Sequence, residues 1–197
     1  MPTYDIGLEH VSLAFATKTI FTDVTQGVFE GDRIGIVGKN GVGKTTFINL
    51  LIGNMDPSDP GTVTGEIQRG ESLRIGYYRQ SGIQFDENQT VLETVNDTHL
   101  LSQFLFPHDM LNNRISKLSG GEKRRLYLLT ILMRQPNLLI MDEPTNDLDV
   151  ETLDLLQDLL GEYDGTVLLV SHDRDFIDRV ATTTIALEGQ GRATVYA

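Results

Sequence analysis

A glycine-rich stretch constrains this chain more than any other part of its sequence. It runs from Gly38 to Thr45 with the pattern G-x-x-x-x-G-K-T, between an apolar strand predicted at residues 33–37 and a helix predicted at residues 45–52. Glycines at this spacing permit a tight loop whose backbone N–H groups turn inward, and these donors can surround a chain of phosphates together with the positive end of the helix. The pattern in this context predicts a phosphate-binding loop; a chance glycine-rich turn is the alternative.

Two side chains at the end of this loop suit a nucleotide and a metal ion. Lys44 can reach the β- and γ-phosphates, and the hydroxyl of Thr45 suits Mg²⁺, which prefers oxygen ligands. We therefore expect a nucleoside triphosphate bound with Mg²⁺. The residues of the loop expected to contact it are Gly38, Asn40, Gly41, Gly43, Lys44, Thr45 and Thr46.

Two acidic residues follow an apolar run that is predicted to be a buried strand. Asp142 and Glu143 come directly after the strand at residues 137–141, where acids are costly unless a cation meets them. We expect Asp142 to hold Mg²⁺ through its water shell. In a strand-like backbone Glu143 would point the other way, where it could position and polarise an attacking water as general base. The alternative is a solvated strand end with Pro144 as a stop.

A second helix start has the chemistry of an anion site. Ser119 is followed three residues later by Glu122, which is the pattern of a capping box before a helix predicted at residues 122–133. Gly120 and Gly121 leave backbone N–H groups exposed in the first turn, so the helix end offers a site for negative charge. An ordinary helix cap explains the same pattern, and spacing alone does not say whether both helix starts serve one nucleotide.

The order of predicted elements is that of an α/β fold. Strands are predicted at residues 6–15, 24–29, 33–37, 73–78, 137–141 and 166–171, helices at 45–52, 122–133, 150–160 and 174–180, and a terminal hairpin at 185–196. We expect residues 54–70 to be loop and turn. Apolar strands alternating with helices predict a P-loop core with a mostly parallel sheet, covered on both faces and flanked by an antiparallel β edge. A small helical subdomain at about residues 84–132 would be inserted into this single domain of residues 1–197.

Composition narrows the range of partners. The formal charge of −12 argues against a broad nucleic-acid-binding face, although a local basic contact at Lys123, Arg124 and Arg125 remains open. The sequence contains no cysteine, so it offers no disulfide and no thiolate zinc site. Its longest nearly apolar run, residues 126–133, is far shorter than the roughly 20 residues that cross a bilayer. We expect a cytoplasmic protein with no membrane span.

These motifs together resemble the ATP-binding-cassette (ABC) ATPases. The phosphate loop, the stretch of residues 118–122 and the Asp142–Glu143 strand end match that family in order and spacing, over essentially the whole chain. The resemblance implies Mg²⁺-dependent hydrolysis of ATP by two cassettes that close head to tail on two nucleotides. The signature residues would then contact the ATP of the partner cassette in trans; they are Ser119, Gly120, Gly121 and Glu122. The partner would be a second cassette of the same parent chain or another copy of this one.

Four further roles come from the same resemblance. Gln80 would touch Mg²⁺ and the attacking water, and His172 would contact the γ-phosphate. Phe15 would stack on adenine, and Asp149 belongs to a loop that communicates across the dimer and is expected to contact nucleotide. Each has a plainer interpretation: a turn residue for Gln80, a capped strand end for His172 and a core position for Phe15.

Two longer stretches resemble one branch of the family. Residues 142–149 and 170–176 resemble ABC-F proteins, and the chain looks like the second cassette of the Uup type. The short stretch at residues 80–118 differs from transporter cassettes, whose helical subdomain is usually larger. The sequence departs from the ABC-F pattern because it has one cassette and no linker, so we expect an excised domain or a fragment. The resemblance implies a mechanical switch acting on ribosomes through regions this segment lacks; the alternatives are the ATPase of a membrane transporter and a module that only binds.

Overall fold

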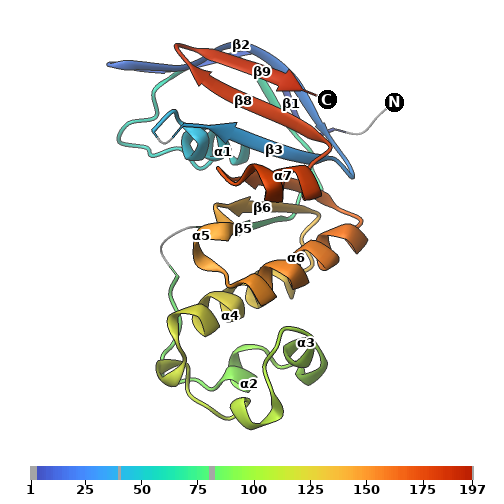
Figure 1. The fold of residues 1–197 in the computed structure, drawn as a ribbon. Coiled ribbons are helices and arrows are strands. Elements are labelled where there is room, and N and C mark those ends of the chain that lie inside the picture. The colour runs from blue at the N-terminus through green and yellow to red at the C-terminus, as the bar shows by residue number, and fades with distance from the viewer. Residues whose placement is uncertain (1–3, 40, 80–82, 197) are drawn as a thin grey trace.

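Six strands form the central sheet, in the order β5-β6-β7-β3-β8-β9. Figure 1 shows the computed structural model, which describes residues 4–39, 41–79 and 83–196. Neighbouring strands from β5 to β8 run parallel, and β9 is antiparallel to β8 at one edge. This confirms the predicted mostly parallel sheet with an antiparallel part. The strands are β3 (Arg33–Gly38), β5 (Ile75–Tyr78), β6 (Leu138–Asp142), β7 (Thr166–Val170), β8 (Thr183–Gly189) and β9 (Arg192–Tyr196).

The middle strands of this sheet are buried on both faces. Every residue of β6 and β7 is buried, which is why both read as continuous apolar runs in the sequence. Leu138 and Ile140 belong to the core on one face, and Leu139 and Met141 belong to the core on the other. Full burial of each such side chain contributes about 1.5–3 kcal/mol, so the two cores hold these strands firmly in place.

A second sheet of three antiparallel strands packs against one face of the central sheet. It has the order β2-β1-β4, with β1 at Tyr4–Phe15 and β2 at Lys18–Phe29. Helix α1 (Lys44–Ile52) shares the core between the two sheets, where Phe47 meets Phe21 edge to face with ring centroids 5.2 Å apart. The helix therefore leaves the phosphate loop with its apolar side already buried.

Strand β4 corrects the prediction that residues 54–70 form only loop and turn. The strand covers Thr62–Arg69 and pairs antiparallel with β1. It is an edge strand with almost every residue exposed, so the alternation that marks a half-buried strand is absent from its sequence. Gly65 sits opposite a bulge in β1 with φ +91°, and a Cβ there would lie 2.3 Å from the carbonyl oxygen of His10.

Helices cover the other face of the central sheet. The helix α7 is at Arg174–Val180, as predicted. Helices α4 (Gly120–Leu132) and α6 (Val150–Glu162) each cover about the span predicted for them, and α5 (Pro144–Asp147) is a short helix that was not predicted. In Figure 1, α4 and α6 lie below β5 and β6, and α7 is drawn between β3 and β6. Among the described residues, no helix has the length and apolar content needed to cross a membrane.

The region between β5 and α4 contains less helix than its sequence spacing indicates. Helices α2 (Val91–Thr94) and α3 (Thr98–Gln103) are short, and two single turns of 3-10 helix follow at residues 108–110 and 115–117. Its apolar side chains nevertheless form one continuous core with α4 and α6, and Leu101 and Phe104 are completely buried in it. A separate helical subdomain at about residues 84–132 stays a prediction.

We predict that Gly65→Ala lowers the free energy of unfolding by about 1–3 kcal/mol, because alanine disfavours a positive φ and its methyl group would strike the β1 backbone. Urea unfolding measures the loss. Gly161→Ala is the matched control, since Gly161 lies in α6 with open space around it and should gain up to about 1 kcal/mol. Equal stability of the two variants would contradict the close packing of β4 on β1.

Candidate nucleotide site

A cavity of about 580 Å³ opens at the carboxyl ends of the parallel strands β3 and β6. This is the edge of an α/β sheet at which ligands generally bind. The cavity brings together residues from the phosphate loop, the end of β6 and the turn after β7, which are far apart in the sequence. Its lining residues are Phe15, Lys18, Ile20, Gly41, Gly43, Lys44, Thr45, Thr46, Asp142, Glu143, Asn146 and His172.

Glycines of the phosphate loop adopt backbone conformations that favour glycine, as expected for a tight loop. Gly41 and Gly43 have φ values of +77° and +109°, which side chains with a Cβ rarely adopt. A Cβ on Gly38 would lie 2.6 Å from Val42 and 2.8 Å from a backbone oxygen of β8. A Cβ would therefore clash at Gly38 and at Gly43, whereas at Gly41 the obstacle is the positive φ alone. Helix α1 begins directly after the loop at Lys44. The predicted contact Asn40 lies outside the described residues.

The Lys44 ammonium group lies inside the loop. Its side chain is 8 % exposed, and its Nζ donates a hydrogen bond of 2.7 Å to the carbonyl oxygen of Gly38. The same Nζ is 3.6 Å from Glu143 Oε1. A buried ammonium with one carbonyl and one carboxylate nearby retains donor capacity for a bound phosphate oxygen.

Asp142 is a buried carboxylate beside the Thr45 hydroxyl. Thr45 Oγ1 donates to Asp142 Oδ2 at 3.2 Å, and Tyr77 Oη donates to the same oxygen at 3.4 Å. Burial raises the pKa of Asp142 above its usual range, while the hydrogen bond from Thr45 opposes that rise. A desolvated carboxylate that lacks a full cationic partner is suited to a metal ion.

The oxygen atoms of Thr45 and Asp142 fit Mg²⁺ rather than a metal held by protein ligands alone. The described residues contain no cluster of three His, Cys, Asp or Glu side chains that could hold a metal ion. Mg²⁺ commonly uses one or two protein oxygens and takes the rest of its ligands from phosphates and water. The pair found here is of that kind.

Glu143 corrects one prediction about its backbone. It does not continue the strand: β6 ends at Asp142, and Glu143 has left-handed φ and ψ of 52° and 51° as the N-cap of α5. Its N–H donates to the carbonyl oxygen of Val170, and its own carbonyl accepts from Asn146 N–H. This turn brings Glu143 into the same cavity as Asp142 instead of pointing it to the opposite face.

Glu143 meets two nitrogen groups through its two carboxylate oxygens. His172 Nδ1 donates to Oε2 at 2.9 Å, and Lys44 Nζ lies 3.6 Å from Oε1. The His172 backbone N–H also lies 3.3 Å from Oε2. The predicted residues Glu143, His172 and Lys44 therefore form one connected group at the cavity wall, and their chemical roles stay predictions.

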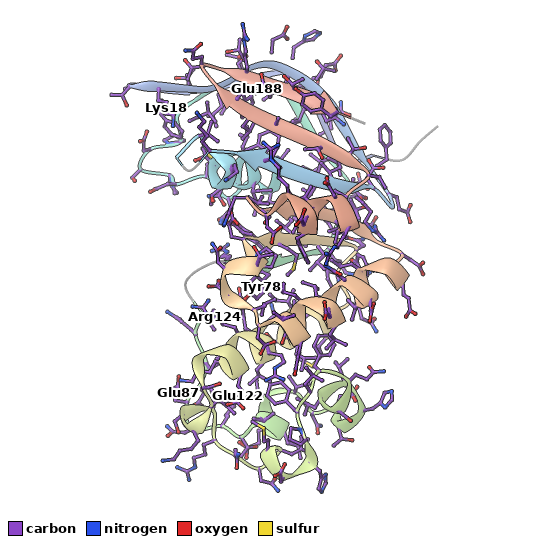
Figure 2. The ribbon with its side chains drawn as sticks, in the orientation of Figure 1. Lys18, Tyr78, Glu87, Glu122, Arg124 and Glu188 are labelled. Carbon is purple, nitrogen blue, oxygen red and sulfur yellow. The ribbon has the colours of Figure 1, made fainter. Side chains whose placement is uncertain are left out.

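Three lining residues were not predicted from the sequence. Lys18, whose Nζ donates to the carbonyl oxygen of Gly41, and Ile20 lie on β2, and Asn146 lies on α5. In Figure 2, Lys18 lies at the upper left, at the end of the strands that is near the phosphate loop. Ile20 could have been found from its strand alternation, but nothing in the sequence indicates that the β1–β2 turn folds onto the loop.

Several predicted residues lie elsewhere. The signature residues Ser119 and Glu122 form the predicted capping box, with hydrogen bonds of 3.2 and 2.8 Å, but they do not line the cavity. Asp149 caps α6 by accepting from Thr152 N–H, and this hydrogen bond lowers the pKa of the carboxyl group. Gln80 lies outside the described residues.

The basic run beside the signature is engaged within the chain. Lys123 pairs with Glu87, and Arg124 pairs with Asp147. Arg125 donates to a backbone oxygen and stacks 5.0 Å from the ring of Phe106. Each of the three basic side chains therefore has a partner within the chain.

A protein-family model described as "ABC transporter" matches residues 21–146, which include the phosphate loop, the signature and Asp142–Glu143. The chain belongs to this family. It is an ABC ATPase domain, for which ATP hydrolysis is the expected activity.

Individual relatives place this ABC domain among ATP-binding proteins. The "ATP-binding protein Uup" of Haemophilus influenzae is 43 % identical over 96 % of this chain. The "Energy-dependent translational throttle protein EttA" of the same organism is 34 % identical over 97 % of this chain. The chain spans only 31 % and 36 % of the length of these two relatives.

A solved structure supports the fold of the ABC domain. The "Structure of ATP binding subunit of ABC transporter" superposes with a TM-score of 0.78, over 99 % of this chain and 90 % of that one, at 21 % identity. At this identity the likeness concerns the fold alone.

We predict that Asp142→Asn raises the melting temperature of the protein without nucleotide or Mg²⁺. Because burial raises the pKa of Asp142, stability falls as pH rises from the unfolded to the folded pKa, and this loss persists at neutral pH. The amide removes the charge yet still accepts from Thr45. Calorimetry should show a rise of about 2–4 °C for each kcal/mol gained.

The exposed Asp158→Asn is the control for this experiment, and its melting temperature should not change. A lower melting temperature for Asp142→Asn at neutral pH would show that the Asp142 carboxylate stabilises the fold, contrary to our account.

Proposed function

We propose that this domain binds ATP with Mg²⁺ and hydrolyses it when paired with a second cassette. The observation that carries the proposal is the convergence of Lys44, Asp142 and Glu143 on one cavity beside the phosphate loop. Family membership supports adenine nucleotide as the substrate.

The residues of the cavity divide the work of phosphoryl transfer. Backbone N–H groups of the loop and the start of α1 would hold the phosphate chain, and Lys44 would turn from Gly38 to the β- and γ-phosphates. Mg²⁺, held by Thr45 and Asp142, would neutralise charge on the phosphate oxygens. Phe15 lines the cavity where it could face the adenine ring.

Glu143 is the proposed general base. It would orient the attacking water and accept its proton, while the bond from His172 keeps the carboxylate aimed into the cavity. Lys44 Nζ, 3.6 Å from the other carboxylate oxygen, lies on the same side of the cavity. His172 would also contact the γ-phosphate.

The second cassette is proposed because the signature is remote from the cavity of its own chain. The capping box orders the start of α4, and Gly120 and Gly121 have open space around them. Such a helix end suits the phosphates of a nucleotide held by another cassette. ATP would thus close two cassettes, and hydrolysis would release them.

The longer protein is proposed to be an ABC-F factor that acts in translation. The names and identities of Uup and EttA support this, as EttA is described as a translational throttle protein. Pull-down of the full natural protein carrying Glu143→Gln, with ATP, should recover ribosomes. Recovery with membranes instead would favour a transporter ATPase.

We predict that Glu143→Gln retains ATP, dimerises and loses turnover by about 10²–10⁴-fold, because glutamine cannot accept the proton. Lys44→Ala should instead weaken ATP affinity by about 10- to 100-fold, from the loss of a charge-assisted hydrogen bond. Fluorescent-nucleotide binding and phosphate release separate the two effects. Normal turnover by Glu143→Gln would refute its role as base.

We also predict that the ATPase rate rises with the square of protein concentration at low concentration, since two chains must form each active pair. Steady-state phosphate release over a dilution series tests this. A rate strictly proportional to concentration would show that one chain is sufficient, whereas no turnover at any concentration would leave only binding.

A further inference from the structure

A partly buried ion pair joins α4 to α5, the short helix that Glu143 caps. Arg124 Nη1 on α4 lies 2.9 Å from Asp147 Oδ2 on α5, with the two side chains 34 % and 12 % exposed. Both atoms are buried, and neither has a hydrogen-bond partner among the residues that the structure describes. Each charge therefore depends on the other, because a buried charge left without its partner is strongly destabilising.

The same face of α4 also contacts strand β5. Tyr127, one helical turn after Arg124, packs its ring 5.4 Å from that of Tyr78 and donates from its hydroxyl to the carbonyl oxygen of Tyr77. Figure 2 shows Arg124 and Tyr78 near each other between α4 and α5. Burial raises the pKa of the Tyr78 hydroxyl. The Asp147 carboxylate adds to this rise and the Arg124 guanidinium opposes it, so both charges of the ion pair act on the Tyr78 hydroxyl.

The position of α5 determines the position of Glu143. Glu143 is the N-cap of α5, and its left-handed backbone is strained for a residue with a side chain, so the surroundings must hold it. The helix is only four residues long, with Asp147 as its last residue. A displacement of Asp147 is therefore transmitted through one helical turn to the carboxylate at the cavity.

We propose that Arg124 is a positioning residue for hydrolysis, which through Asp147 holds α5 and keeps the Glu143 carboxylate against His172. This inference rests on the proposed function. Helix α4 starts at the signature, which is proposed to contact the nucleotide of the second cassette. Through the ion pair, the position of Glu143 would therefore depend on the position of α4, and so on whether the signature contacts that nucleotide.

The neighbouring residue provides a matched comparison. Lys123, also on α4, pairs with Glu87 at 3.1 Å. The carboxylate of that pair is 50 % exposed, and the pair leads to the loop before α2 rather than to α5. In Figure 2 Glu87 lies further from Tyr78 than Arg124 does. Glu87→Gln therefore removes an ion pair of α4 without touching α5.

The test compares Arg124→Met, Asp147→Asn and the double variant Arg124→Met/Asp147→Leu with Glu87→Gln. Each single change at the pair should lower kcat by about 10- to 100-fold through misplacement of Glu143, with KM for ATP nearly unchanged. The double variant removes both charges, so it should regain thermal stability but not kcat, and Glu87→Gln should keep both.

A readout that needs no turnover accompanies the kinetics. In the ATP-free protein, the ring ¹⁵N resonances of His172 should change in Arg124→Met and not in Glu87→Gln, because the bond from His172 to Glu143 is altered. Unchanged resonances, or a double variant that recovers kcat together with stability, would overturn the inference. If the wild type fails to bind ATP while the resonances change as expected, the proposed function fails and the positioning link stands.

Discussion

The parallel pairing of β6, β7 and β3 is the constraint on which this molecule depends. These strands are buried on both faces, and their register aligns Asp142 with Val170 and Ile36 with Val170. Parallel strands deliver their carboxyl ends to one edge, so the phosphate loop, the acidic pair and the turn with His172 meet without any further device. The burial of the apolar strands therefore stabilises the arrangement that brings the polar residues of the site together.

The site contains features that oppose folding when no ligand is bound. Asp142 is a desolvated carboxylate with a raised pKa, and Glu143 holds a left-handed backbone. Both are tolerated because the surrounding cores and ion pairs supply more stability than these features remove. Groups kept in costly states next to a cavity are typical of functional sites, since the ligand then relieves the cost on binding.

Sequence reasoning succeeded where local pattern and burial agree. The phosphate loop, α1 and α7 follow from glycine spacing and apolar periodicity, and the convergence of Asp142 with the loop follows from parallel strand order. It failed at β4, because an exposed edge strand has no apolar face to detect. The conformation of Glu143 depends on tertiary packing of α5, which no spacing reveals.

Side-chain partners were the hardest feature to predict. The run of Lys123, Arg124 and Arg125 reads as one basic cluster, yet each residue contacts a different part of the chain. Helical geometry separates consecutive residues by about 100°, so their partners are chosen by the packing of α4 rather than by sequence proximity. The ion pair between α4 and α5 became visible only in three dimensions.

The central claim is that backbone amides of the loop hold the phosphates of a nucleotide, and backbone NMR tests it most directly. On titration with ATP and Mg²⁺, the largest and saturable shifts should occur at the amides of Gly41, Gly43, Lys44 and Thr45, and titration with adenosine should leave them in place. Saturable binding that leaves these amides unchanged, or no binding by the folded protein, would contradict the account.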